Sequence, residues 1–217
     1  VEWQKLIESE KITIWNTVPA QMEMFVSYLQ AEQLKGADSL RLVMLSGDWI
    51  PVNLPIRIRE LFKKTDIVSL GGATEASIWS IFHIIDPNHR YEKSIPYGKP
   101  LSNQEFYVLD NDLNICPDWV EGRLYIAGEG LANGYLNDPK LSSEKFIMHE
   151  KLKKRLYNTG DNGRYHPDGT IEFLGRVDGQ VKIRGHRVEL AELESVANSF
   201  PKVDTSVAIL SNKNKNS

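Results

Sequence analysis

Short apolar runs and amphipathic stretches alternate over the first hundred residues. Runs rich in β-branched and aliphatic residues predict strands at 12–16, 40–45 and 66–70. Pro19 begins an amphipathic stretch with an apolar stripe at helical spacing, and residues 55–62 form a second predicted helix. Because strands and helices alternate and glycines follow the last two strands, the pattern predicts a parallel α/β sheet. Ligands of such sheets bind beyond the carboxyl ends of the strands.

From about Tyr97 the pattern changes to short strands separated by turns. Strands are predicted at 106–109, 122–126 and 170–174, and turns such as Pro167-Asp168-Gly169 lie between them. The regular spacing of these strands predicts a small β-barrel or a β-rich layer.

A third unit is predicted to begin at Asp178. A charged alternating stretch at 181–184 is followed by an acidic helix start at 190–194. The forty or so residues that remain are too few to form an independent core.

Composition narrows the classes of function. The chain has 217 residues, 41% of them hydrophobic, which is enough for a substantial core. The formal net charge of -3 argues against a nucleic acid or an anionic membrane as the main partner. No apolar run reaches the ~18 residues of a membrane helix, and the first residues lack the pattern of a signal peptide.

The single cysteine, Cys116, excludes an internal disulfide framework and fits a reducing compartment, so we expect a cytoplasmic protein. Its neighbours Ile115 and Pro117 favour a structural role for the thiol, because no base can be placed beside it. The five histidines show no spacing typical of metal ligands.

Residues 71–75, with the sequence Gly-Gly-Ala-Thr-Glu, follow the third predicted strand. Two glycines let the backbone approach a ligand closely, and the hydroxyl and carboxylate beside them suit a phosphate oxygen and Mg²⁺. The alternative is a strand-to-helix turn in which Thr74 and Glu75 cap the helix. Taken alone, the motif favours the turn.

Three charged residues later in the chain have a structural interpretation, and one of them, Asp161, has a binding interpretation as well. Asp161 is suited to bind a ribose diol, since a carboxylate accepts two hydroxyl hydrogens, and it is equally suited to an Asx-turn. Arg176 and Asp178 flank a predicted turn, where a surface ion pair would contribute little to stability.

Two further stretches are similar to motifs of other protein classes. The basic residues of 182–187 are similar to a nucleic-acid patch, but the glutamates of 189–194 offset their charge and favour a solvated face. The glycines of 128–134 do not have the spacing of a dinucleotide-binding loop, and Pro139 interrupts the helix that should follow.

Five segments occur in an order that resembles the later core motifs of adenylate-forming enzymes. They are residues 71–75, 95–100, 122–135, 157–161 and 175–189. The family they resemble most is the adenylation domain of nonribosomal peptide synthetases. The resemblance implies an α/β fold: the second half of the large adenylate-forming domain, with a parallel sheet and a small β-barrel, followed by the start of a small α+β C-terminal subdomain.

The same resemblance divides the chain into three parts. Residues 1–95 are expected to form the α/β sheet portion of the large subdomain, and residues 96–177 its barrel-like portion. Residues 178–217 would begin the C-terminal subdomain, with Asp178 at the hinge and Gly185 near the pantetheine tunnel of the thioester-forming state. Since the family's phosphate loop and late lysine are absent from this sequence, we expect a fragment that is inactive alone.

The resemblance assigns nucleotide-binding roles by matching position. Thr74 and Glu75 are the expected catalytic residues at the ATP phosphates, and Glu75 is also the expected Mg²⁺ ligand. Asp161 is expected to bind the ribose hydroxyls, supported by Arg176. The remaining expected nucleotide contacts are Gly47 and Asp48 on the adenine side, Gly71, Gly72, Ala73 and Phe173.

A substrate pocket is implied in the same way. Its expected positions are Asn16, Met44, Ser46, Leu70, Ile78 and Trp79. This combination resembles a cysteine-activating signature in which Met44 replaces leucine. A small pocket with one hydroxyl, one amide and a tryptophan wall suits a compact, polarisable side chain.

The implied reaction joins an amino-acid carboxylate to the α-phosphate of ATP and releases pyrophosphate. The aminoacyl group then passes to the phosphopantetheine thiol of a peptidyl carrier protein domain, and a condensation or cyclisation domain of the same synthetase is a further expected partner. An acyl- or aryl-CoA ligase of the same superfamily is one alternative. A non-catalytic scaffold is another, motivated by Gly71, which stands where the family has an aromatic residue that stacks on adenine.

Overall fold

The computed structural model describes residues 2–176, 180–183, 186–200, 203 and 205–209. Asp178 and Gly185, expected at the hinge and near the pantetheine tunnel, lie outside the described residues. None of the helices within the described part of the chain is both long and apolar enough to cross a membrane.

The first sheet has five strands in the order β1-β2-β3-β4-β5. Strands β1, β2 and β3 are parallel, which confirms the predicted parallel sheet, whereas β4 and β5 run antiparallel. The strands are β1 (Ile14–Thr17), β2 (Leu42–Ser46), β3 (Asp66–Gly71), β4 (Ile81–Ile84) and β5 (Lys99–Pro100). The helices of this half are α1 (Glu2–Ser9), α2 (Pro19–Ala31) and α3 (Leu54–Leu61).

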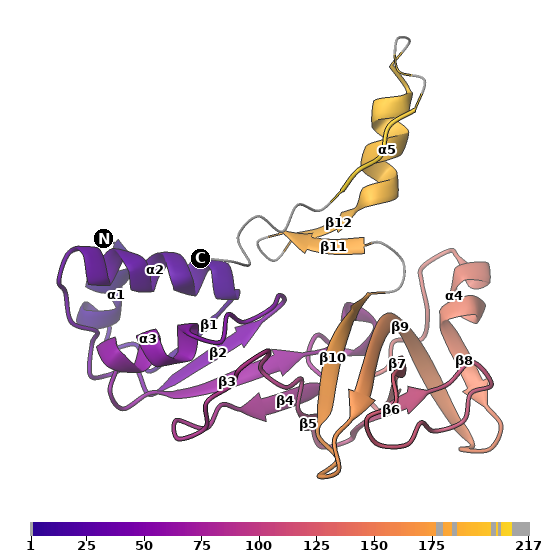
Figure 1. Cartoon of the computed structure of the whole chain (residues 1–217), viewed down its shortest axis with the longest axis horizontal. Helices are drawn as coiled ribbons and strands as arrows, with labels where there is room; N and C mark the ends of the chain where they lie inside the picture. Colours follow the sequence, from indigo (N-terminus) through magenta and orange to yellow (C-terminus); the bar gives the residue numbers. More distant parts are fainter. Residues whose placement is uncertain (1, 177–179, 184–185, 201–202, 204, 210–217) are drawn as a thin grey trace.

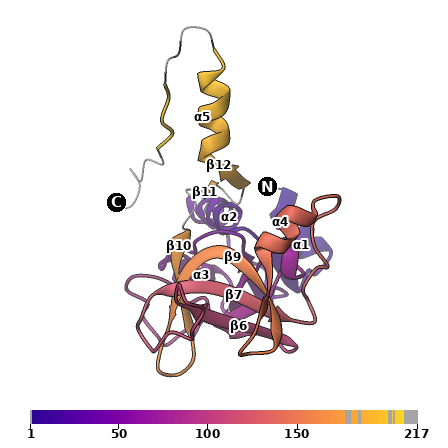
Figure 2. The ribbon, with the colours of Figure 1, turned by 90° about the vertical axis from the view of Figure 1, so that its right-hand side faces the viewer.

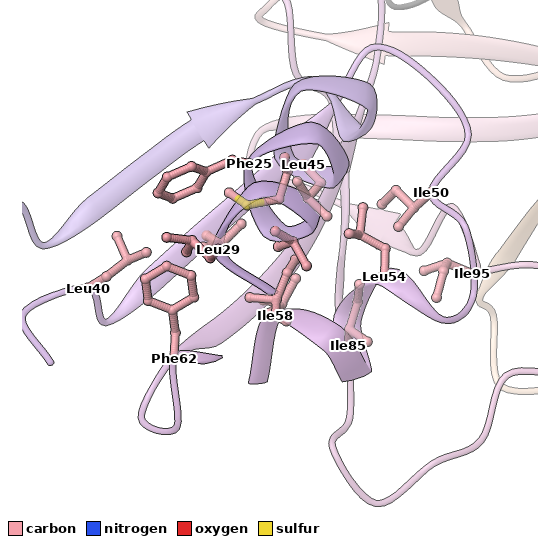
Figure 3. Close-up of a cluster of buried hydrophobic side chains, with 14 of the residues drawn as sticks. Phe25, Leu29, Leu40, Leu45, Ile50, Leu54, Ile58, Phe62, Ile85 and Ile95 are labelled. Carbon is pink, nitrogen blue, oxygen red and sulfur yellow. The ribbon is translucent and has the colours of Figure 1, made fainter. Parts of the chain in front are cut away.

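The apolar stripe that predicted α2 forms the centre of the first core. Met22, Phe25, Val26 and Leu29 are all buried, and Pro19 occupies the first turn, where its missing N–H needs no partner. Figure 3 shows Phe25 and Leu29 among aliphatic side chains of the neighbouring strands and helices. Burial of each such side chain stabilises the fold by about 1.5–3 kcal/mol.

The second sheet is antiparallel, in the order β10-β9-β7-β6, with β8 paired to β9. Its strands are β6 (Gln104–Leu109), β7 (Gly122–Gly128), β8 (Phe146–His149), β9 (Lys154–Tyr165) and β10 (Ile171–Arg176), and α4 (Pro139–Lys145) precedes β8. Figure 2 shows β9, β7 and β6 as curved strands that lie next to one another in this order.

The β-rich layer is confirmed, but the predicted barrel does not close within the described residues. β6 and β10 are the two ends of the strand order, and no ladder joins them in that part of the chain. β10 instead bonds to the segment before β5: the Tyr97 N–H donates to Ile171 O at 2.9 Å, and the Ile171 N–H donates to Gly98 O at 2.8 Å. The edge of the second sheet is therefore tied to the first sheet.

Several elements were not predicted from the sequence pattern. They are α1, α4, β4, β5, β8, β9 and β12. Two glycines, Gly160 and Gly163, lie inside β9, and glycine interrupts the apolar alternation that identifies a strand. Pairing to β7 and β10 on both sides nevertheless keeps this segment extended.

The end of the described chain forms a small separate unit. β11 (Gln180–Ile183) and β12 (His186–Glu189) pair antiparallel, and α5 (Leu190–Asn198) follows directly. Figure 1 shows these elements, in yellow, standing away from the two sheets. The acidic helix start predicted from residue 190 corresponds to α5.

Candidate functional site

One cavity of about 300 Å³ lies beyond the carboxyl ends of β2 and β3, between the first sheet and the end of β10. This is the position expected for a ligand of a parallel α/β sheet. Its lining includes these predicted nucleotide contacts: Gly47, Asp48, Gly71, Gly72, Asp161, Phe173 and Arg176. Four predicted substrate-pocket residues also line it: Ser46, Leu70, Ile78 and Trp79.

Asp161 and Arg176 form an ion pair in the cavity wall, which Asp48 also lines. They are direct partners in the β9–β10 register, and Arg176 Nη1 donates to Asp161 Oδ1 at 3.0 Å. Both side chains are 14% exposed, so solvent screens this pair less than an ordinary surface pair. Cross-strand pairing therefore places an oriented carboxylate and a guanidinium beside the cavity.

The backbone around Asp161 is fixed by a neighbouring threonine. The Asp161 N–H donates to Thr159 Oγ1 at 3.0 Å, and Thr159 Oγ1 donates to Leu124 O at 2.8 Å. Arg176 Nη1 also donates to Thr159 O at 3.2 Å. Asp161 thus lies within a strand, and its carboxylate contacts Arg176 instead of closing a local turn.

Glycine turns form another part of the cavity lining. Gly47 follows β2 with φ 88°, and Gly72 follows β3 with φ 145°, conformations that other residues rarely adopt. A Cβ atom on Gly72 would lie 2.6 Å from Ile78 O and 2.7 Å from Ser80 N. The backbone can therefore pass close to a ligand here only because these positions carry no side chain.

Aromatic rings complete the lining. The Phe173 ring lies 5.3 Å from the Trp49 ring and 5.5 Å from the Tyr97 ring, measured between centroids. The Gly72 N–H donates to Tyr97 Oη at 3.0 Å. Burial, together with the nearby Asp161 carboxylate, raises the pKa of Tyr97 and keeps the phenol neutral.

Thr74 and Glu75, the expected catalytic pair, follow Gly72 along the chain but are not among the residues that line the cavity. They belong to a short 3₁₀ helix, Thr74–Ala76, that has no side-chain cap, so the capping alternative is not supported. Thr74 is exposed, whereas Glu75 is 9% exposed and accepts a hydrogen bond from Tyr135 Oη at 2.6 Å. Burial and the nearby Glu75 carboxylate raise the pKa of Tyr157.

The predicted substrate positions share one face of the first sheet. Asn16 pairs with Met44, and Ser46 pairs with Leu70, so alternation along the strands directs these side chains to the same side. Asn16 and Met44 lie further along that face and are not part of the cavity lining. Ala73 also lies outside the lining.

The turn after Glu75 holds an unusual backbone. Ser77 and Ile78 have φ 62° and 73°, both in the left-handed region. A β-branched residue is disfavoured there, and such strain persists only where surrounding contacts enforce it. Ile78 is 65% exposed and lines the cavity, so the strain lies at the candidate site.

Sequence reasoning gave no role to several lining residues. Those are Trp49, Ile50, Ser69, Ile95, Pro96, Tyr97 and Gly175. The one available signal was the aromatic Tyr97 inside the segment 95–100, whose order along the chain supported the family resemblance.

The surroundings of Cys116 bear on the role of its thiol. Cys116 is buried in the second core, and burial raises the pKa of its thiol, which favours the structural interpretation. Among the described residues, no three His, Cys, Asp or Glu side chains gather as a metal cluster.

Comparison with known proteins defines the class first. The family model described as "AMP-binding enzyme" matches residues 1–136, more than half of the chain. The chain belongs to the AMP-binding enzyme family.

Individual relatives narrow the comparison. Pyochelin synthetase PchF of Pseudomonas aeruginosa is 49% identical over 208 residues, which cover 96% of this chain and 11% of that protein. The structure of the nonribosomal peptide synthetase FmoA3 with α-methyl-L-serine-AMP matches with 43% identity and a TM-score of 0.77, covering 84% of this chain and 21% of FmoA3. Holo-PA1221, a synthetase protein with adenylation and PCP domains, matches at 28% identity and TM-score 0.83, over 91% of this chain and 34% of that one.

The chain thus spans about a tenth of the length of the pyochelin synthetase it matches. Its fold is that of nonribosomal peptide synthetase adenylation domains, which agrees with the α/β fold class predicted from the sequence.

Proposed function

We propose that this chain is part of an ATP-dependent adenylation domain in a nonribosomal peptide synthetase. The observation that carries the proposal is that the Asp161–Arg176 pair and the glycine turns of Gly47 and Gly72 line one cavity. A carboxylate oriented in this way accepts hydrogen bonds from a ribose diol, and the glycine turns leave room for the rest of a nucleotide.

The proposed reaction forms an aminoacyl adenylate. A carboxylate oxygen of the amino acid bonds to the α-phosphorus of ATP, and the bond between that phosphorus and the bridging oxygen of pyrophosphate breaks. The thiol of a carrier-protein phosphopantetheine then takes the aminoacyl group and AMP leaves. No protein nucleophile is needed, so the chain contributes positioning and charge.

Individual residues have distinct proposed roles. Asp161 binds the ribose hydroxyls, and Arg176 holds the Asp161 carboxylate in place. Gly47 and Asp48 lie on the base side, and Thr74 contacts the phosphates. The hinge role of Asp178, the role of Gly185 and the three-part division of the chain stay predictions.

Glu75 fits a magnesium ligand by its chemistry. Mg²⁺ is usually held by one or two carboxylates together with substrate phosphates, and Glu75 is one buried carboxylate whose orientation Tyr135 fixes. When bound, the ion would neutralise phosphate charge. The Tyr135 hydroxyl holds Glu75 Oε1 for that purpose.

We propose cysteine as the amino-acid substrate. Ser46, Leu70 and Trp79 give the cavity one hydroxyl, one aliphatic group and an indole wall, which suits a compact side chain. FmoA3 holds α-methyl-L-serine-AMP, the adenylate of another small amino acid. A peptidyl carrier protein and a condensation or cyclisation domain are the proposed partners.

Amino-acid-dependent ATP–pyrophosphate exchange by the intact adenylation domain tests this function. We expect exchange with cysteine to exceed exchange with serine, valine and α-aminobutyrate. Equal exchange with all four would reject cysteine as the substrate and leave adenylation standing. Exchange with acyl or aryl acids alone would favour a CoA ligase, and no exchange with any acid would reject the function.

A further inference from the structure

Position 71 has no room for a side chain, because another residue's ring fills the space. A Cβ atom built on Gly71 would lie 1.8 Å from Tyr97 Cε2 and 2.4 Å from Tyr97 Cζ. Gly71 is the last residue of β3, while Tyr97 reaches this point from the segment before β5. Gly71 and Tyr97 therefore fit together. The Tyr97 ring occupies the space that a side chain at position 71 would need.

The Tyr97 ring is held from several sides. The Gly72 N–H donates to Tyr97 Oη at 3.0 Å, and the Tyr97 N–H donates to Ile171 O at 2.9 Å. The ring also contacts Phe106 and Phe173 at centroid distances of 5.9 and 5.5 Å. Because backbone and ring are both anchored, the ring is preorganised before any ligand arrives.

Tyr97 faces the same cavity as the Asp161–Arg176 pair. With Trp49 and Phe173 it gives this cavity a wall of aromatic rings. Aromatic rings contact nucleic-acid bases through their π-faces, and such contacts tolerate any base because every base has a π-face. A base wall next to a diol-binding carboxylate is the arrangement that a nucleoside requires.

We propose that Tyr97 forms the base-contacting wall of the nucleotide site and that Gly71 is required to admit its ring. This inference rests on the proposed nucleotide-binding function. Tyr97 would be a binding residue that touches the purine, and Gly71 a positioning residue that acts through Tyr97. Gly71 then no longer motivates a non-catalytic scaffold, since the aromatic group is supplied by another segment.

The first test replaces Tyr97 in the intact adenylation domain and measures ATP affinity by calorimetry. Tyr97→Leu removes the ring, and we expect ATP binding to weaken roughly tenfold or more, as for loss of one aromatic–base contact. Tyr97→Phe keeps the ring and loses only the bond from the Gly72 N–H, so we expect a change of about threefold or less.

Tyr165 supplies the matched control. Its Oη accepts the Val108 N–H at 3.1 Å, so Tyr165→Leu also removes a ring and a backbone hydrogen bond, yet Tyr165 does not line the cavity. We expect Tyr165→Leu to lower thermal stability with ATP affinity unchanged. Equal losses of affinity in Tyr97→Leu and Tyr165→Leu would show that general loosening is responsible and would overturn the proposal.

The second test substitutes Gly71 alone and together with Tyr97. Gly71→Ala alone forces the new Cβ into the Tyr97 ring, so we expect both stability and ATP affinity to fall. Adding Tyr97→Leu removes that clash, and the double variant should regain stability while ATP affinity stays low. If the double variant is no more stable than Gly71→Ala, the two positions are not coupled and the role of Gly71 is refuted.

Different results would refute the proposed function and the proposed role of Tyr97. If the wild-type domain shows neither ATP binding nor pyrophosphate exchange, the proposed function is wrong. If the wild type exchanges and Tyr97→Leu binds ATP with wild-type affinity, the function stands and the role of Tyr97 is overturned.

Discussion

The two sheets contribute different chemistry to one cavity. The first sheet supplies backbone and small groups at Gly47, Gly71 and Gly72, where added atoms would collide with neighbours or need a strained backbone. The second sheet supplies charge, through Asp161 on β9 and Arg176 on β10. The first sheet therefore makes room, and the second sheet orients the polar contacts.

This difference predicts how the halves respond to substitution. Adding atoms should be most harmful at the strand ends of the first sheet, and removing charge should be most harmful on the second sheet. Some substitutions should weaken ligand binding, and others should lower only stability. The reason is that only some of the strained or charged groups on the two sheets line the cavity.

The largest expected effect is the removal of charge from the second sheet. Asp161→Ala should lower kcat/KM for pyrophosphate exchange at least about 100-fold, or roughly 2.7 kcal/mol, because the ribose contact is lost and Arg176 loses its carboxylate partner. Asp112→Ala, an exposed turn residue on the same half, is the control. Similar losses in both variants would contradict a specific role for Asp161.

A smaller effect is expected from Tyr135, which follows β7 of the second sheet and donates a hydrogen bond to Glu75, which follows β3 of the first sheet. Tyr135→Phe removes the hydrogen bond to Glu75, which should cost about 1 kcal/mol and raise the Mg²⁺ concentration for half-maximal exchange about fivefold. Tyr107→Phe removes a phenol bonded to the more exposed Glu105 and should leave the Mg²⁺ dependence unchanged. An unchanged Mg²⁺ titration in Tyr135→Phe would separate Glu75 from the metal.

Charge on the second sheet outside the cavity should affect stability alone. Burial opposes ionisation of Glu172, but hydrogen bonds from Arg164 and His166 outweigh it, so the pKa of Glu172 is lowered. Glu172→Gln should therefore reduce stability by about 1 kcal/mol at pH 7, with exchange activity retained.

The sign of the pH dependence follows from the lowered pKa of Glu172. Its ionised form stabilises the fold above the ordinary glutamate pKa, and that contribution is lost as pH falls through the folded-state value. Thermal melts of wild type and Glu172→Gln should converge at acid pH. A stability gap that persists below the folded pKa would reject the ion pair as its source.

The smallest expected effect comes from backbone strain on the first sheet. Ile78 is a largely exposed β-branched residue in the left-handed region, so Ile78→Gly removes backbone strain. Glycine also gives the unfolded chain more conformational freedom, which offsets part of this gain, and the net increase in stability should be about 0.5 kcal/mol. Selectivity among small amino acids should fall, because Ile78 lines the cavity. Lys153→Gly, at φ 56° in a distant turn, should change stability alone.

Local pattern was sufficient for the three parallel strands of the first sheet and for α2 and α3. Pro19 and the stripe that follows it predict α2 because both signals lie within one helix. β9 was not predicted, because Gly160 and Gly163 break the alternation and pairing partners on both sides enforce the strand. Of the two predicted alternatives, the β-rich layer is confirmed and no closed barrel forms among the described residues, since strand spacing along the chain does not state which strand edges pair.

The candidate site also contains contacts that the sequence pattern did not predict. Arg176 was expected to support Asp161 only through family resemblance, and the β9–β10 register makes them direct partners. Tyr97 received no role, because its contact with Gly71 joins segments 26 residues apart. Contacts between such distant segments are specified by packing, which a linear pattern does not contain.

The sequence by itself determined the alternation of β1, α2, β2, α3 and β3, the glycine turns after β2 and β3, and an order of motifs sufficient to predict the family. Those features depend on neighbouring residues, whose backbone preferences act locally. Tertiary structure alone decided that Tyr97 fills the space that a side chain on Gly71 would need, that Glu75 is held by Tyr135 and that β6 and β10 are not paired within the described part of the chain. Each of these depends on close packing and hydrogen bonding between segments that meet only in the folded chain.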